Sequence, residues 1–143
     1  RRALYLLEPE CQRRGVDLQI QTDDAVLVQA DPVALDQIIH NLLMNALQAL
    51  EKSDKLPRTL RVAVANRESK GELLVADNGY GIPPEVLPHL FEPFFSTRDS
   101  GLGLGLTLCE TLANGMGGQL SVRNQVDGGA AFTLTLPLVK ALP

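Results

Sequence analysis

The sequence predicts an α/β fold, a two-layer sandwich in which a mixed, mostly antiparallel sheet carries helices on one face. Two segments, 32–51 and 104–114, have the apolar periodicity of helices, and several others alternate or run as short apolar stretches typical of strands. Apolar residues make up 45% of the 143 residues, although tryptophan is absent. The core is therefore expected to be aliphatic and large enough to need no disulfide or structural metal.

The N-terminal part is predicted to form a helix followed by two short strands. Residues 3–14 are typical of a helix that Gly15 ends. Residues 18–21 alternate like a half-buried strand, and residues 26–28 are predicted to form the second strand.

The longest predicted helix spans 32–51. Asp31 offers an N-cap acceptor, and Pro32 suits the first helical position. Its apolar stripe comprises Leu35, Ile38, Ile39, Leu42, Leu43, Ala46 and Leu50. A second stripe holds three amide side chains: Asn41, Asn45 and Gln48. Aligned amides on a helix that otherwise packs a core predict the wall of a polar pocket.

The rest of the chain is predicted to complete the sheet and add a second main helix. Residues 60–64 and 73–77 are predicted strands, and the almost wholly apolar second one is expected to be central. The other expected elements are a turn or short helix from Pro83, a loop over 91–100, a helix over 104–114 that Gly115 ends, and strands 120–122 and 132–136 joined by a turn at 127–129.

Charge and cysteine content limit the partners that are expected. The net charge is −4 and the sequence lacks a strong basic cluster, so nucleic acid is not an expected partner. Cys11 and Cys109 are far apart and are expected to be reduced, partly buried thiols of a cytoplasmic protein. Because no apolar run could span a bilayer, we expect no direct membrane contact. The chain begins with Arg1 rather than methionine, so we expect residues 1–143 to be a single domain cut from a longer protein.

Asp77 ends the predicted central strand and precedes the glycine turn Asn78-Gly79-Tyr80-Gly81. A carboxylate can accept a hydrogen bond from an exocyclic amino group, which adenine presents where guanine presents a carbonyl. We therefore expect a site that favours adenine, in which Gly79 and Gly81 allow close backbone approach and Ile82 is an apolar wall. Alternatively, the segment is only a turn that ends a strand.

Asn45 offers a neutral amide oxygen, a donor that suits a hard cation. Mg²⁺ prefers few protein ligands and several phosphate and water oxygens, so one asparagine can suffice. The alternative is a helix asparagine that bonds locally or to solvent.

A glycine loop, Gly101-Leu102-Gly103-Leu104-Gly105, leads into the last predicted helix. Its exposed backbone N–H groups and the positive end of the helix suit a polyphosphate. Thr97 and Arg98 precede the loop, and Arg98 could meet terminal phosphate oxygens. The loop lacks the Gly-Lys-Ser/Thr of a P-loop and is no convincing dinucleotide fingerprint; a flexible hinge and a solvated arginine are the alternatives.

In this order, the segments resemble the catalytic ATP-binding domain of bacterial sensor histidine kinases, whose Bergerat fold is shared with gyrase, a heat-shock chaperone and mismatch-repair ATPases. Residues 36–46 look like the asparagine box of that family, and residues 77–82 look like its first glycine box. Residues 91–95 look like its phenylalanine box, 101–106 like its second glycine box, and 129–137 like its closing strand. The resemblance covers nearly the whole chain, and four boxes in order make it specific.

The resemblance implies ATP and Mg²⁺ as cofactors and assigns a role to each box. Asn45 would hold the metal, Asn41 would assist near the phosphates, and Asp77 would bind adenine. Asn41, Asn45 and Arg98 are the residues expected to take part in catalysis. The expected nucleotide-binding residues are Asn41, Asn45, Gln48, Asp77, Gly79, Gly81, Ile82, Thr97, Arg98, Gly101, Leu102, Gly103, Leu104 and Gly105.

The segment between Phe95 and Gly101 is short, which is similar to the nitrogen-regulation and dicarboxylate-sensing subgroup rather than to the long-lid osmosensor type. The chain also departs from the family pattern. Arg98 stands where a lysine is common, and Leu102 replaces a frequent threonine, which removes one hydroxyl contact. Neither change removes a residue that we expect to be essential.

The resemblance also implies the reaction. Hydrolytic members of the superfamily carry a glutamate general base one turn before the metal asparagine, and here that position is Asn41, which is no base. Transfer of the γ-phosphoryl group of ATP to a histidine, in two-component signal transduction, is therefore expected. The acceptor histidine would lie on a separate dimerisation domain of the same or a partner chain, with a response regulator downstream and a homodimeric parent that could be anchored in the inner membrane. The alternatives are an ATP-hydrolysing conformational switch and a degenerate nucleotide-binding scaffold.

Overall fold

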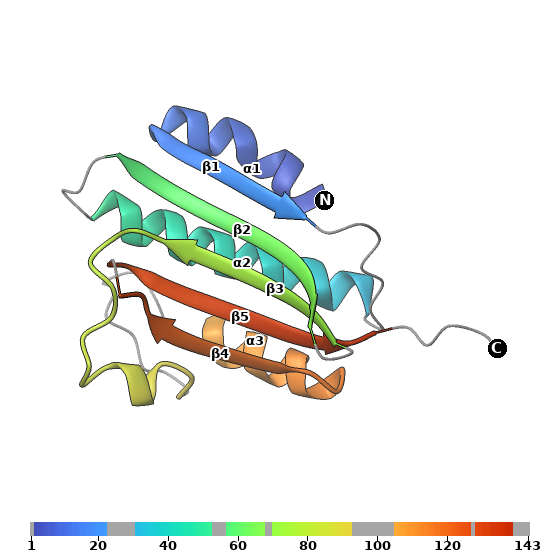
Figure 1. Cartoon of the computed structure of the whole chain (residues 1–143). Coiled ribbons are helices and arrows are strands. Elements are labelled where there is room, and N and C mark those ends of the chain that lie inside the picture. Colours follow the sequence, from blue (N-terminus) through green and yellow to red (C-terminus); the bar gives the residue numbers. More distant parts are fainter. Residues whose placement is uncertain are drawn as a thin grey trace.

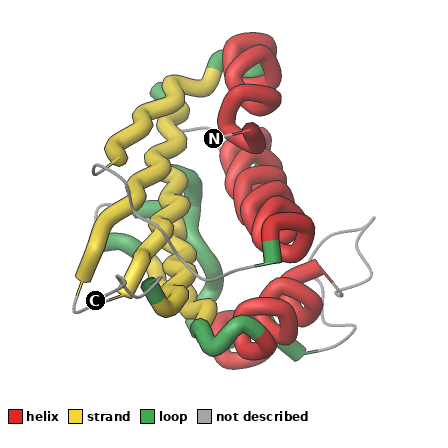
Figure 2. Tube along the Cα trace, turned by 90° about the vertical axis from the view of Figure 1, so that its right-hand side faces the viewer, coloured by secondary structure: helices red, strands yellow, loops and turns green. Residues whose placement is uncertain are grey.

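The computed structural model describes residues 2–22, 31–52, 57–67, 70–92, 105–126 and 128–138. The elements follow in the order α1 (Arg2–Arg13), β1 (Val16–Thr22), α2 (Pro32–Glu51), β2 (Arg58–Arg67), β3 (Lys70–Asp77), η1 (Leu87–His89), α3 (Gly105–Gly115), β4 (Gln119–Asn124) and β5 (Ala130–Pro137). One sheet faces the viewer in Figure 1, and the side view in Figure 2 shows α1, α2 and α3 together on one of its faces. The predicted two-layer α/β sandwich is confirmed.

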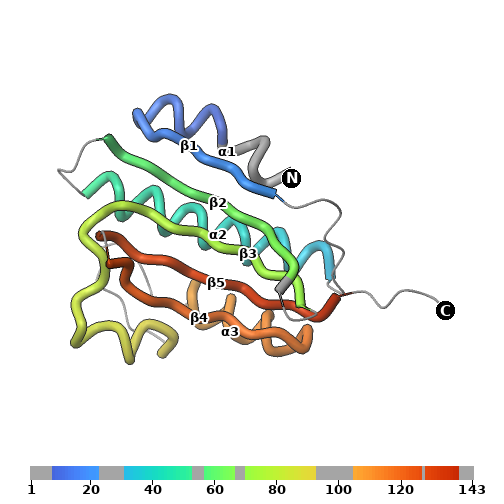
Figure 3. The backbone as a smooth tube through the Cα atoms, in the orientation of Figure 1, coloured from blue at the N-terminus to red at the C-terminus, as the bar shows by residue number. Residues whose placement is uncertain are grey.

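The sheet has five strands in the order β1-β2-β3-β5-β4. β1 pairs with β2 in parallel, and every other neighbouring pair is antiparallel, so the predicted mixed, mostly antiparallel sheet is confirmed. The apolar strand β3 is central, as predicted, and Figure 3 shows it between β2 and the red β5. Because β3 is central, the chain leaves the sheet at Asp77 between the neighbouring strands β2 and β5 and not beside an edge strand.

The aliphatic core lies between the sheet and α2. Fully buried residues of α2 pack in one cluster with buried residues of the sheet, namely Ile38, Leu42, Leu43, Leu47 and Leu50 with Leu60, Val62, Val75 and Leu134. Leu47 is 0% exposed although the predicted apolar stripe omitted it. The reason is that α2 contacts both the sheet and α3, which widens its buried face beyond a single stripe. Cys11 and Cys109 are free, buried thiols, as expected.

Most predicted elements are present, and several are longer than expected. α2 has the predicted bounds, and Asp31 caps it by accepting a hydrogen bond from the Val33 N–H at 2.9 Å. β2 and β3 extend well beyond the predicted cores, because their antiparallel pairing continues through polar residues to Arg67 and Lys70. The predicted strand at 26–28 and most of the predicted loop over 91–100 lie outside the described residues.

The predicted end of the last helix at Gly115 is confirmed to within one residue. Gly115 is the final residue of α3, and the left-handed residue is Gly117, with φ +76°. The Gly118 N–H donates to the Ala113 carbonyl at 2.9 Å, and the Gly117 N–H donates to the Asn114 carbonyl at 3.1 Å. This is the Schellman pattern, and it ends the helix because only glycine readily adopts the positive φ that the pattern needs.

Candidate functional site

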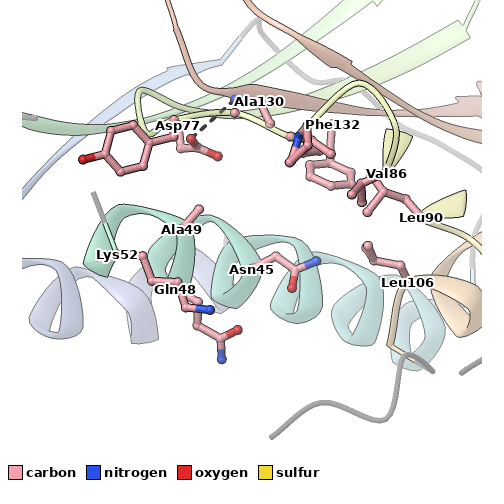
Figure 4. Close-up of a pocket in the computed structure, with 14 residues that line it drawn as sticks. Asn45, Gln48, Ala49, Lys52, Asp77, Val86, Leu90, Leu106, Ala130 and Phe132 are labelled. Carbon is pink, nitrogen blue, oxygen red and sulfur yellow. Dashed lines mark hydrogen bonds between the residues drawn. The ribbon is translucent and has the colours of Figure 1, made fainter. Parts of the chain in front are cut away.

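A pocket of about 210 Å³ lies between α2, the segment that follows β3, and the start of β5. Its lining residues are Asn45, Gln48, Ala49, Lys52, Asp77, Tyr80, Gly81, Ile82, Pro83, Val86, Leu90, Leu106, Ala130 and Phe132. Figure 4 shows α2 on one side of the pocket and Asp77 facing it from the sheet side, with apolar side chains gathered toward the other end. The pocket therefore has a polar region and an apolar region.

Asp77 provides the carboxylate of the pocket. Its exposure is 4%, and among the described residues it is the one buried polar or charged residue. Its Oδ1 accepts hydrogen bonds from the Gly79 N–H at 2.9 Å and from the Ala130 N–H at 3.4 Å. A buried carboxylate needs such donors, because an uncompensated charge away from water is costly. These bonds fix the plane of the carboxyl group beside the cavity.

The polar side of α2 forms the opposite wall, as the amide stripe predicted for Asn45 and Gln48. The Oε1 atom of Gln48 is buried and has no hydrogen-bond partner among the described residues. A buried acceptor of this kind normally receives a hydrogen bond, so a ligand or water donor is expected there. Lys52 adds a cation to this wall. Sequence reasoning missed it, although the spacing from Asn45 to Lys52 continues the same helical stripe.

Asn41 lies one turn before Asn45 but is not among the described residues that line the pocket. Its Nδ2 instead donates a hydrogen bond to the Sγ of Cys109 on α3, at 3.5 Å. Burial raises the pKa of the Cys109 thiol, and the hydrogen bond from Asn41 partly opposes this effect. The amide stripe of α2 therefore divides between a contact with α3 and the pocket.

The apolar region of the pocket combines residues from four parts of the chain. Ile82, predicted as an apolar wall, lines it together with Val86 and Leu90 from the segment around η1. Leu106 from the first turn of α3 and Phe132 from β5 complete it. Such walls suit the flat, apolar faces of a ring system. Apart from Ile82, these side chains were missed, because their separate positions carry no local signal.

The glycines after β3 are packed against the protein itself. A Cβ at Gly79 would lie 3.3 Å from the Ala49 carbonyl oxygen. Gly81 has φ +83°, and a Cβ there would lie 2.8 Å from the Oδ1 of Asn124. We expected these glycines to let backbone approach a ligand, and Gly81 does line the pocket. The structure adds a different reason for them, which is close packing against α2 and β4.

Several expected site residues lie outside the described part of the chain. They are Thr97, Arg98, Gly101, Leu102, Gly103 and Leu104. Gly105 is the first residue of α3, and a Cβ at this position would meet none of the described residues within 4 Å. Packing against the described part of the chain therefore gives no reason for glycine at this position.

The described residues include no group of three or more His, Cys, Asp or Glu side chains that could hold a metal ion. Asn45, which was predicted as the metal ligand, does line the pocket, and its side chain carries an amide oxygen of the kind that can bind a metal ion. A single amide oxygen fits Mg²⁺, which takes few protein ligands when phosphate and water oxygens complete its shell.

Among the described residues, no helix has the length and apolar character needed to cross a membrane.

Comparison with known proteins identifies the family. Residues 30–140 match the family described as histidine kinase-, DNA gyrase B- and HSP90-like ATPase. The chain belongs to this family. It is 40% identical over 142 residues to the C4-dicarboxylate transport sensor protein DctB of Pseudomonas aeruginosa, a match that covers 92% of this chain and 23% of DctB. The chain therefore spans about a quarter of the length of this relative.

Solved structures agree with this assignment. The catalytic domain of the histidine kinase ThkA superposes with a TM-score of 0.83 at 28% identity, covering 95% of this chain and 88% of the solved catalytic domain. Full-length ShkA in complex with AMPPNP has a TM-score of 0.83 at 26% identity, covering 99% of this chain and 30% of ShkA. The chain is homologous to the catalytic domains of sensor histidine kinases, and the resemblance stated from its motifs is confirmed.

Proposed function

We propose that this domain binds Mg-ATP and transfers the γ-phosphoryl group to a histidine on a separate phosphoacceptor domain. The observation that carries the proposal is the buried Asp77 carboxylate at the pocket, facing the amides of α2. The homology to sensor histidine kinases, one of them solved with AMPPNP, supports it.

The base is proposed to lie in the apolar region with its exocyclic amino group toward Asp77. Oδ1 of Asp77 already accepts two backbone N–H groups, so the amino group would donate to Oδ2. Ile82 and Phe132 would contact the faces of the ring, and the Gln48 Oε1 would accept from a nucleotide hydroxyl or an ordered water. Guanine would be disfavoured, because its carbonyl would face the carboxylate.

The phosphates are proposed to extend toward Asn45 and the loop before α3. Asn45 would hold Mg²⁺ through its amide oxygen, and Mg²⁺ when bound would neutralise charge on the phosphates. Thr97, Arg98 and the loop over 101–104 would supply the phosphate contacts that the family resemblance implies. Asn41 would assist near the phosphates through its amide oxygen, which the bond from Nδ2 to Cys109 does not involve.

The reaction is proposed to be phosphoryl transfer rather than hydrolysis. The position one turn before Asn45 is Asn41, which cannot take a proton from water. A histidine nitrogen of the acceptor domain would form the new N–P bond, while the bond from the γ-phosphorus to the bridging oxygen breaks and ADP leaves. The protein would contribute mainly by holding the nucleotide in line with the acceptor.

The partners are proposed on the same basis. The acceptor histidine would belong to a domain outside residues 1–143, on the same or a partner chain of a homodimeric parent, with a response regulator receiving the phosphoryl group afterwards. We place this domain in the cytoplasm, where ATP is available, and regard it as the catalytic part of a longer sensor kinase.

The test has two stages. Calorimetry with a non-hydrolysable ATP analogue and Mg²⁺ should show binding to the domain, and the matching GTP analogue should bind much more weakly. The domain with labelled ATP should then label the phosphoacceptor domain of the parent protein but not the same domain with its histidine replaced by alanine. Saturable ATP hydrolysis without transfer would point to a conformational switch, and binding without transfer or hydrolysis would point to a nucleotide-binding scaffold.

A further inference from the structure

The last residue of β4 and the first residue of the turn after it hold the segment 77–82 through two amide side chains. Asn124, the last residue of β4, accepts a hydrogen bond from the Ile82 N–H at 2.7 Å and donates one to the Ile82 carbonyl at 2.7 Å. One side chain thus satisfies both backbone groups of Ile82, as a neighbouring strand would. Ile82 is a wall of the pocket, so this pair sets the position of that wall.

Gln125 makes the corresponding contact with Asp77. Its Nε2 donates to the Asp77 backbone carbonyl at 2.8 Å, and its backbone N–H donates to the Gly129 carbonyl at 2.8 Å within the turn. The β3–β5 pairing ends at Ala76 and Ala131, so Asp77 is the first residue beyond that ladder. The Gln125 side chain therefore supplies a bond to Asp77 where the backbone of β5 no longer pairs.

Steric packing supports the same arrangement. Gly129 has φ +88°, and a Cβ there would overlap the Asp77 carbonyl. A Cβ at Gly81 would collide with the Asn124 amide oxygen. Glycine at both positions lets the turn and the segment 77–82 approach closely enough for the hydrogen bonds of the Asn124 and Gln125 side chains to form.

We propose that Asn124 and Gln125 are positioning residues of the nucleotide site, which fix the Asp77 carboxylate relative to the Ile82 wall and thereby set the preference for adenine. The inference rests on the proposed function, because it concerns the same pocket. Neither residue is among those that line the pocket, so each acts through the backbone that it holds. Gln125 acts on Asp77 directly and should have the larger effect.

The readout is the contribution of the adenine amino group. Adenosine and purine riboside differ only in that group, so the dissociation constant of purine riboside divided by that of adenosine measures how well Asp77 meets the amino group. In Gln125→Glu, which keeps the shape but removes the donor, we expect this ratio to fall roughly fivefold to tenfold toward one, the loss of one hydrogen bond. Asn124→Asp should lower it less. A role in stability alone would weaken both ligands equally and leave the ratio unchanged.

The matched control is Gln119→Ala, which removes an exposed amide from the start of the same strand, β4, and should leave the ratio unchanged. The ligands are titrated by NMR, with folding of each variant checked by circular dichroism. A ratio within twofold of wild type in both Gln125→Glu and Asn124→Asp would overturn the inference and leave the proposed function intact. No adenosine binding to wild type would instead overturn the proposed function.

A measurement on the wild type covers the case in which the variants do not fold. The Ile82 amide hydrogen, held by Asn124, should exchange with solvent more than tenfold more slowly than in an unstructured peptide, without any ligand, because it is hydrogen-bonded. Exchange at the unstructured rate would refute the positioning role of Asn124.

Discussion

Asp77→Asn is the substitution that tests the proposed base recognition most directly. In the structure, Oδ1 of Asp77 accepts from the backbone N–H groups of Gly79 and Ala130. The asparagine oxygen must remain at the Oδ1 position, because turning the amide would leave both N–H groups facing an NH₂ group at a cost of about 1–3 kcal/mol each. The new NH₂ group therefore takes the Oδ2 position and faces the base.

The expected change in affinity follows from this orientation. The adenine amino group would lose a hydrogen bond to a charged acceptor, which contributes about 1.5–3 kcal/mol. That loss corresponds to roughly 10- to 150-fold weaker binding of ADP. Purine riboside 5′-diphosphate, which lacks the amino group, should bind Asp77→Asn and wild type about equally. Inosine diphosphate, with a carbonyl at the same position, should gain affinity in the variant.

The three diphosphates are titrated calorimetrically with Mg²⁺ into wild type and Asp77→Asn. The differences in binding free energy give the coupling free energy between the Asp77 side chain and the adenine amino group. Asp31→Asn is the control, because Asp31 is an N-cap carboxylate whose replacement keeps an acceptor for the Val33 N–H. An equal loss of affinity for ADP and for the purine diphosphate would show that Asp77 does not contact the amino group, and the proposed orientation of the base would be wrong.

Three further predictions follow from the structure. Asn45→Ala should abolish the Mg²⁺-dependent part of ATP affinity and leave adenosine binding unchanged, which titrations with and without Mg²⁺ would reveal; an equal loss for both ligands would contradict a metal role. Gly129→Ala should lower the free energy of unfolding in urea by about 3 kcal/mol or more, because the Cβ overlaps a backbone carbonyl at positive φ. Gly115→Ala should be neutral or stabilising, because a Cβ there meets none of the described residues within 4 Å. Burial raises the pKa of the Cys11 and Cys109 thiols, so they should stay protonated and react slowly with a disulfide reagent at pH 7. The folded state retains thiol protons that the unfolded state releases. The free energy of unfolding should therefore fall as the pH rises above the unfolded thiol pKa of about 8.5. In Cys109→Val, the free energy of unfolding from urea denaturation should depend less on pH over this range.

Local patterns predicted much of the fold. The bounds of α2 follow from Asp31, Pro32 and the apolar repeat, and the central place of β3 follows from its apolar sequence. The end of α3 was predicted to within one residue, but the sequence does not display that Gly117 is the glycine with the positive φ. Strand ends were underestimated because backbone pairing does not require an apolar side chain.

The candidate site was predicted in part. Asp77, Asn45, Gln48, Gly81 and Ile82 do meet at one pocket, since each belongs to a motif with its own local signal. The apolar walls other than Ile82 were missed, because they come from the segment around η1, from α3 and from β5 and share no spacing.

Local sequence patterns indicate which segments become helices and strands, which family the chain resembles, and which polar residues the motifs offer. They do not indicate that Asn41 bonds to Cys109, 68 positions away, or that Gln125 reaches the Asp77 carbonyl, 48 positions away. Helical and strand periodicity is a property of neighbouring residues. Contacts between distant segments depend on the register of the sheet and on where each turn ends, and these are fixed only when the layers pack.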